Sequence, residues 1–167
     1  MKSIALILSL LLFFSCSTKK TDKELFDEAK KNLTEQEFPE AVLSFEQLLN
    51  DYPESNLAPE ALSELASIYQ NNQVKSLSLE QNLEKAIELF KQLHDEYASS
   101  EYAPSALFMA GFIYANELQN YNAATEIYQQ FLDEYPDSEL AASAQAELDN
   151  MGLTPEEILS KKLANEN

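Results

Sequence analysis

Apolar and polar residues alternate along this chain with the period of an amphipathic helix. Between Asp22 and Met151 the apolar residues recur at intervals of three and four, which marks one face of an α-helix. A first stripe is formed by Leu25, Ala29 and Leu33, and a second by Ala41, Phe45, Leu48 and Leu49. Gly111 is the only glycine in this segment, which favours helix throughout. The pattern predicts an all-α fold without strands.

Paired stripes return twice further along the chain. The second pair consists of Leu62, Leu65, Ala66 and Tyr69 with Ala86, Phe90 and Leu93, and the third of Leu107, Gly111 and Tyr114 with Ala124, Tyr128 and Phe131. In the helix that follows, Gln145 and Asp149 stand where earlier repeats have apolar residues. A last helix with a polar outer face is how a stack of repeats ends. After Gly152, residues 154–157 predict the start of a short tail helix.

One phrase joins each pair to the next. It reads "DYPESNLA" from Asp51, "EYASSEYA" from Glu96 and "EYPDSELA" from Glu134. Where proline follows the tyrosine it stops the helix, because proline cannot continue a helix and disfavours helix in the residue before it. We expect the serine of each phrase to cap the next helix and to lengthen it by nearly one turn. The phrase is therefore predicted to be the corner between helix pairs.

Two capping boxes predict further helix starts. Residues 34–37 offer one between the first two helices, and residues 78–81 offer another at the second helix of the middle pair. Equivalent first-helix positions at Asp22, Pro59, Pro104 and Ala142 give repeat lengths of 37, 45 and 38 residues. The middle repeat thus carries an insertion within residues 71–84, predicted to be partly longer helix and partly protruding loop. This loop is either a partner contact or a tolerated insertion.

The repeating unit resembles the tetratricopeptide (TPR) repeat. The resemblance rests on small residues at Ala29, Ala66 and Gly111 in the first helices and at Ala41, Ala86 and Ala124 in the second helices. With its Tyr-Pro-x-Ser-x-x-Ala phrase, the chain is similar to envelope TPR lipoproteins, especially the BamD-type lipoproteins of outer-membrane β-barrel assembly and the periplasmic Tol-Pal coordinator. The resemblance implies a solenoid of about three helix pairs plus a C-terminal capping helix, whose first helices line a concave groove.

The groove positions of the TPR family can be carried over to this chain. They are Lys23, Phe26, Lys30 and Leu33, then Glu60, Ser63, Ser67 and Gln70, then Ser105, Phe108, Phe112 and Ala115. Among them, Phe26, Lys30, Phe108 and Phe112 are the expected candidates for partner binding, because aromatic anchors dominate interface energies. Phe108 and Phe112 either hold a partner's helix or extended peptide, or belong to the core.

The first residues predict export and lipidation. Lys2 precedes a nearly unbroken apolar run at residues 4–14, which is too short to span a bilayer. Cys16, the only cysteine, follows and resembles the lipobox of bacterial lipoproteins. The resemblance implies a lipid on Cys16 and an outer-membrane protein facing the periplasm; the alternative is a soluble secreted protein. We expect a signal peptide at residues 1–15, a lipidated tether at 16–21, the TPR domain at 22–151 and a tail at 152–167.

The charge makes nucleic acid a poor partner. The chain holds 29 acidic residues, 11 lysines and no arginine, and a mature chain beginning at Cys16 would carry 10 − 29 = −19. Half of its lysines lie close to the expected anchor, at Lys19, Lys20, Lys23, Lys30 and Lys31. This basic stub is either attracted to anionic head groups, while the acidic body is held off them, or it is a solvated tether.

Residue types required for catalysis are scarce. His94 is the only histidine and Cys16 is assigned to the anchor, so no nucleophile has a base beside it. No zinc, calcium or phosphate motif is present, and we expect no cofactor and no metal. We therefore expect a non-catalytic scaffold that binds an envelope protein or peptide, with outer-membrane protein assembly as the leading task. The alternatives are a self-associating structural lipoprotein and an envelope enzyme or small-ligand binder.

Overall fold

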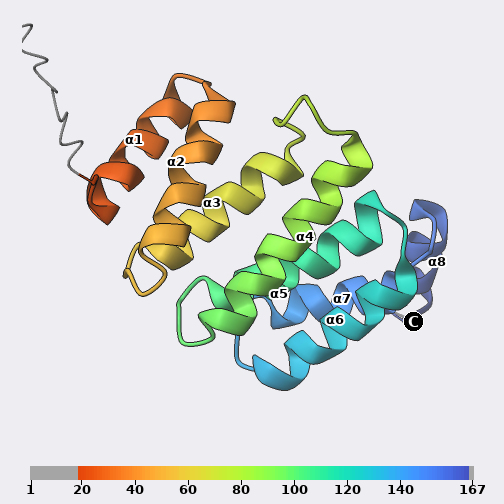
Figure 1. Cartoon of the computed structure of the whole chain (residues 1–167). Helices are drawn as coiled ribbons and strands as arrows, with labels where there is room; N and C mark the ends of the chain where they lie inside the picture. The colour runs from red at the N-terminus through yellow and green to blue at the C-terminus, as the bar shows by residue number, and fades with distance from the viewer. Residues whose placement is uncertain (1–18, 166–167) are drawn as a thin grey trace, which may run out of the picture.

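The structure, a computed structural model, describes residues 19–165 as helices joined by short turns (Figure 1). In chain order the elements are α1 (Asp22–Thr34), α2 (Phe38–Asp51), α3 (Ala58–Gln70), α4 (Leu79–Glu96), α5 (Ala103–Phe112), the π-helix η1 (Ile113–Glu117), α6 (Tyr121–Glu134), α7 (Ala141–Asn150) and α8 (Pro155–Asn165). No strand occurs within residues 19–165, so the predicted all-α fold is confirmed.

The helices stack as antiparallel pairs. α1 packs on α2, α3 on α4, and α5 with η1 on α6, while each second helix also packs on the first helix of the next pair. α7 packs on α6 and closes the stack, as expected of a TPR-like solenoid. In Figure 1 the turns within pairs lie along one edge of the molecule, which we call the hairpin edge. The joins between pairs lie along the opposite edge, which we call the corner edge.

The small residues expected at the close helix contacts are buried. Ala29, Ala41, Ala66, Ala86 and Ala124 have no exposed surface. A Cβ atom added at Gly111 would lie 2.9 Å from Cε1 of Tyr128 and 3.2 Å from Cγ2 of Ile127. Because real Cβ atoms keep a greater distance, α5 approaches α6 at a separation that only glycine allows.

Three corners follow one local pattern. We call residues 51–57 corner 1, residues 96–102 corner 2 and residues 134–140 corner 3. The expected serine cap is wrong, because α3, α5 and α7 begin three residues after the serine and have no side-chain cap. Instead, Ser55 Oγ accepts a hydrogen bond from the N–H of Leu57 at 3.1 Å, and the serines of corners 2 and 3 accept the equivalent bond. The serine orders a turn ahead of the helix and does not lengthen the helix.

α2 starts without the capping box predicted at residues 34–37. Thr34 is the last residue of α1, and its hydroxyl donates to the carbonyl of Lys30 at 3.0 Å. Gln36 turns the chain with a φ of 61°, and Glu37 precedes α2 without capping it. The box prediction is therefore wrong, because the threonine on which it depends already belongs to the preceding helix.

The capping box predicted at the start of α4 is confirmed. Ser78 and Gln81 bond each other's backbone N–H, and α4 has 18 residues where α2 and α6 have 14. The side chain of Asn82, which is fully buried, holds the loop before α4 by hydrogen bonds. Its Nδ2 lies 3.0 Å from Oδ1 of Asn72 and 3.1 Å from the carbonyl of Val74. Residues 71–78 thus form a fixed protrusion on the hairpin edge (Figure 1).

The stack ends at α7 as the polar substitutions predict. Ala144 is the one residue of α7 that is buried, and exposed Gln145 donates to exposed Asp149 at 3.1 Å. Gly152, with a φ of 75°, ends this segment. Thr154 and Glu157 then cap each other's backbone N–H at the start of α8, which confirms the expected tail helix.

Candidate functional site

The expected groove residues on α1 and α3 form a polar surface in which the cation is already paired. We call the twelve residues at the expected groove positions the first-helix face. Lys30 Nζ on α1 forms an ion pair with Glu64 of α3 and lies 3.7 Å from Glu60 Oε1. The hydrogen bond with Glu64 outweighs desolvation and raises the pKa of Lys30. Because two carboxylates face it, Lys30 gives this part of the face no net positive charge.

Phe26 lies beneath the Lys30 side chain. Only 9% of its surface is exposed, and its ring meets that of Phe45 edge to face with the centroids 6.0 Å apart. Lys30 Nζ stands 5.8 Å from the centroid of the Phe26 ring, within cation–π range. The structure thus gives both residues contacts inside the chain, and their expected part in partner binding stays a prediction.

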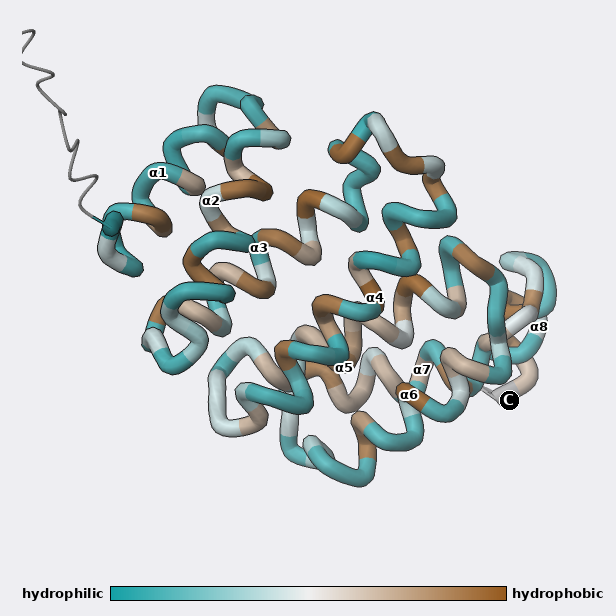
Figure 2. The backbone as a smooth tube through the Cα atoms, in the orientation of Figure 1, coloured by the Kyte–Doolittle hydropathy of each residue, from teal (hydrophilic) through white to brown (hydrophobic). Residues whose placement is uncertain are grey.

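The first-helix face loses its charge at α5. No residue of α5 carries a charge, and in Figure 2 this helix lacks the hydrophilic colour that marks its neighbours. The Phe108 ring packs on Tyr128 and Phe131 of α6, with centroids 5.5 Å and 5.9 Å away. Phe112, one turn further on, is partly exposed and does not number among the side chains packed against the core. The first helix of the third unit therefore offers an uncharged surface on which the rings of Phe108 and Phe112 are both partly exposed, and the Phe108 ring packs on α6.

A π-helical segment follows Phe112 directly. The Leu118 N–H donates to the carbonyl of Ile113 at 3.0 Å, five residues back, which widens the helix at the end of α5. The Asn116 side chain, exposed on this segment, reaches Glu147 of α7 at 3.4 Å. Single π-turns inside helices are often found at functional sites. Here the π-turn places Asn116 within reach of the last helix of the stack.

A buried histidine links the second and third units at the corner edge. His94, at the end of α4, has 6% of its surface exposed. Its Nδ1 lies 2.8 Å from Asp95 Oδ1, and its Nε2 lies 2.8 Å from Glu134 Oε2 at the end of α6. Burial alone would lower the pKa of His94, but the hydrogen bonds and charges of the two carboxylates together raise it. Both ring nitrogens face carboxylates, so the protonated ring suits this position.

We expect the contribution of this link to fall as the pH rises. A raised pKa means that the stabilisation is fully present below the ordinary histidine value of about 6.5 and is lost as the pH passes the raised value. The melting temperatures of the parent and of Glu134→Gln should therefore differ most below the ordinary histidine pKa, and should become equal above the raised pKa of His94. Glu139→Gln, which removes an exposed carboxylate of corner 3, is the matched control. Its difference in melting temperature from the parent should not change across this pH interval. A parent-to-variant difference that does not change with pH would contradict the link.

Corners 1 and 2 enclose an open hollow of about 800 Å³. Its lining includes the carboxylates Glu54, Glu96 and Glu101 and the ring of Tyr97, and contains neither histidine nor cysteine. Within the described part of the chain, no three His, Cys, Asp or Glu side chains are placed to hold a metal ion. Across the same residues, none of the helices combines the length and the apolar character needed to cross a bilayer.

A comparison with known protein families finds a match for this helical stack. The sequence model of the family YfiO, described as "Outer membrane lipoprotein", matches residues 18–153. The chain belongs to the YfiO outer membrane lipoprotein family. The match spans every helix from α1 to α7, so the resemblance to BamD-like TPR lipoproteins is confirmed for that segment. No curated protein sequence matches the chain.

Membership of the YfiO family confirms the outer membrane as the location of this chain. Cys16, the expected site of the lipid, lies outside the described residues. α8 and the rest of the tail follow the matched segment, which stops at residue 153.

Three features of this YfiO-family chain were not expected from its sequence. They are the His94–Glu134 contact, the π-turn after Phe112 and the pairing of Lys30 with Glu60 and Glu64. His94 and Glu134 are 40 residues apart. The corner phrase holds one sequence signal for the acidic partner of His94: the residue before the tyrosine is acidic in all three corners, and in corner 3 it is Glu134.

Proposed function

We propose that this YfiO-family chain is a lipid-anchored, non-catalytic scaffold of the outer membrane that binds a partner protein or peptide on its first-helix face. In this arrangement residues 1–15 are a signal peptide, residues 16–21 a tether lipidated at Cys16, residues 22–151 the TPR domain and residues 152–167 the tail. The body faces the periplasm. The specific task that family membership favours is assembly or upkeep of outer-membrane proteins.

The partly exposed ring of Phe112 on an uncharged helix supports this proposal most directly. Aromatic side chains that are half open in the free protein and become buried in a complex are the usual anchors of an interface. The first helices of the units before and after α5 carry carboxylates, Glu60 and Glu64 on α3 and Glu147 on α7. A helix or extended segment with an apolar side chain, flanked by lysine or arginine, suits such a surface.

The proposal predicts that Phe112→Ala abolishes partner capture and leaves the fold intact. Crosslinked pull-down from outer membranes of the parent strain defines the captured protein, and the same band is then quantified for each variant. Leu43→Ala is the matched control, because Leu43 is 66% exposed on the second-helix side of the stack. We expect Phe112→Ala to lose the captured band while its melting curve stays that of the parent. Leu43→Ala should keep both the band and the melting curve of the parent.

Phe108→Ala should show whether Phe108 stabilises the core or contacts the partner. Because the Phe108 ring packs on two buried rings, its removal should cost stability, about 2 kcal/mol for a half-buried side chain. The result that defeats the first-helix face as the binding surface is a band undiminished in the Phe108→Ala, Phe112→Ala double variant while substitutions in residues 71–78 remove it. In that case the fixed protrusion on the hairpin edge is the partner contact.

A further inference from the structure

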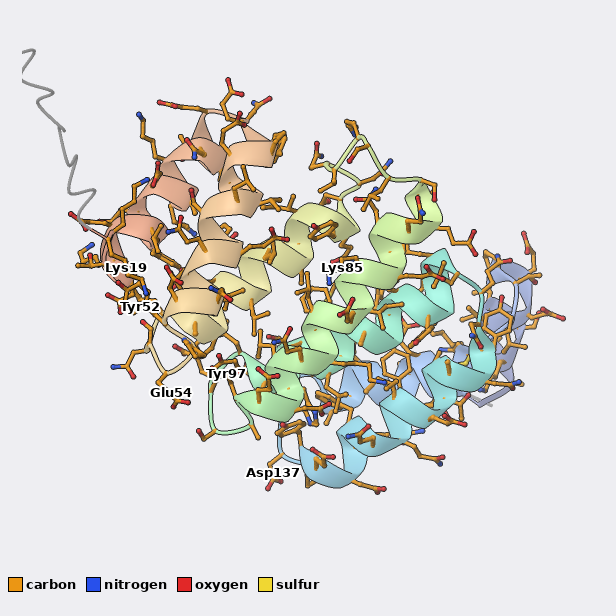
Figure 3. The ribbon with its side chains drawn as sticks, viewed as in Figure 1. Lys19, Tyr52, Glu54, Lys85, Tyr97 and Asp137 are labelled. Carbon is orange, nitrogen blue, oxygen red and sulfur yellow. The ribbon has the colours of Figure 1, made fainter. Side chains whose placement is uncertain are left out.

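The residues that lead into α1, together with its first residue Asp22, are bound to corner 1. We call residues 19–22 the strap. Lys19 Nζ stands 4.9 Å from the centroid of the Tyr52 ring and 3.5 Å from Asp51 Oδ2. The Tyr52 hydroxyl donates to the carbonyl of Lys20 at 2.6 Å. Figure 3 shows Lys19 next to Tyr52 at the start of the corner edge.

Further contacts fix the other end of the strap. Ser55 Oγ donates to Asp22 Oδ2 at 2.6 Å, and Lys20 forms an ion pair with Glu28. The hydrogen bond from Ser55 is the largest cause that lowers the pKa of Asp22. From Lys19 onward the chain is therefore held to the body by these contacts.

Little chain separates the strap from the expected lipid site. Lys19 follows Cys16 by 19 − 16 = 3 residues. Three residues span at most about 11 Å even when fully extended. If Cys16 carries the lipid, corner 1 is thus held within a short distance of the head groups. The turn at the other end of α3 lies about 20 Å from corner 1, because α3 has 13 residues that rise about 1.5 Å each.

Charge then separates corner 1 from the other two corners. Corner 1 and the strap together hold the lysines Lys19 and Lys20 and the carboxylates Asp22, Asp51 and Glu54: 2 − 3 = −1. Corner 2 holds the carboxylates Glu96 and Glu101 and no lysine. Corner 3 likewise holds no lysine, and its carboxylates are Glu134, which contacts His94, together with Asp137 and Glu139.

This difference decides which corners can approach a bilayer. Anionic lipids repel exposed carboxylates within about one Debye length, roughly 10 Å at moderate salt. Corner 1 with its strap carries the smallest net negative charge of the three and the only lysines, so it can approach anionic head groups at a lower cost than corner 3. Figure 3 shows Tyr52, Glu54, Tyr97 and Asp137 following one another along this edge, away from the strap.

We infer that corner 1 and the strap form the surface that rests on the lipid head groups, and that the acidic corners hold the third unit away from the bilayer. The inference rests on the proposed lipid at Cys16 and adds the orientation of the body. The first unit is then membrane-proximal. The uncharged surface around Phe112 stands off in the aqueous compartment, where a soluble or unfolded partner can reach it.

The orientation can be measured with the full lipidated chain in vesicles of phosphatidylethanolamine and phosphatidylglycerol. Lipidation occupies the thiol of Cys16, so Asn56→Cys in corner 1 and Ser76→Cys on the hairpin edge each provide one labelling site. A fluorophore at each site is quenched by lipids that carry a nitroxide on the head group. We expect quenching at residue 56 to exceed that at residue 76 by about twofold or more, given the length of α3.

The strap is tested by the double variant Lys19→Gln, Tyr52→Phe, which removes the cation and the hydroxyl. Quenching at residues 56 and 76 should become nearly equal. The matched control is Lys85→Gln, Tyr97→Phe, because Tyr97 donates the equivalent bond to the carbonyl of Pro53 at 2.8 Å and Lys85 lies on α4, away from the strap (Figure 3). The control should keep the difference between the two labels.

Two outcomes overturn the inferred orientation: equal quenching at both sites in the parent, or an unchanged difference in the strap variant. Failure of the proposed anchor looks different, because the parent would then not float with the vesicles and neither label would be quenched. A parent that floats but shows no difference between its labels leaves the anchor in place and removes the orientation.

Discussion

Gly111→Leu should destabilise the protein by about 3 kcal/mol, the upper end for overpacking in a dense core. A Cβ atom at this position would already lie 2.9 Å from the Tyr128 ring, and a leucine adds three further carbon atoms in the same direction. Tyr128 has no exposed surface and its ring packs against the Phe108 ring, so the added volume must displace packed side chains. For a domain of this size the loss corresponds to a melting temperature lower by about 10 °C.

Gly152→Leu is the matched control for that experiment. At Gly152 a Cβ atom would meet the Tyr121 ring at 3.5 Å, an ordinary contact, and the strain arises from the φ of 75°. Left-handed backbone costs a residue other than glycine about 1 to 2 kcal/mol. The two variants therefore separate volume from backbone strain. Equal melting temperatures would contradict the close crossing of α5 and α6.

Cys16→Ser should release the protein from the membrane. A diacylglyceryl group with an added amide-linked chain buries enough methylenes, at about 0.8 kcal/mol each, to exceed the two-signal threshold for stable attachment. We expect the parent to float with membranes and to incorporate a fatty-acid probe, and the variant to remain in the soluble fraction without label. Ser17→Cys in the Cys16→Ser background moves the thiol by one residue and controls for its position. A variant that still floats, with neither form labelled, would contradict the lipid anchor.

The helices could be predicted from the sequence because their signal is local. The spacing of Leu25, Ala29 and Leu33 describes one helix face wherever that helix lies. The helix α1 starts at the expected residue, Asp22, whereas α3 and α5 start three residues after the serines expected to cap them. Local chemistry was less decisive where two helices compete for one residue. Thr34 could either end α1 or cap α2, and the hydrogen bond to Lys30 within α1 prevailed.

The contacts between units could not be predicted in the same way. They depend on how one pair of helices is rotated on the next, which no spacing within a helix reports. The Tyr52 hydroxyl bonds a carbonyl 32 residues away, and His94 meets a carboxylate 40 residues away. The same limit applies to the candidate site. Phe108 and Phe112 occupy one stripe and are both partly exposed, and only the position of α6 decides that the Phe108 ring packs on two rings of that helix.

The corner tyrosines have a consequence for how such a chain can change its length. Tyr97 donates to the carbonyl of Pro53 in corner 1, and Tyr52 donates to the carbonyl of Lys20 in the strap. The strap thus stands where a preceding corner would be, and corners 1 and 2 each donate one tyrosine hydroxyl to a carbonyl of the segment before them. A tandem duplication from one corner tyrosine to the next would present the same bond at both new junctions. The array can therefore gain a unit in its interior while the strap and α7 keep closing its two ends.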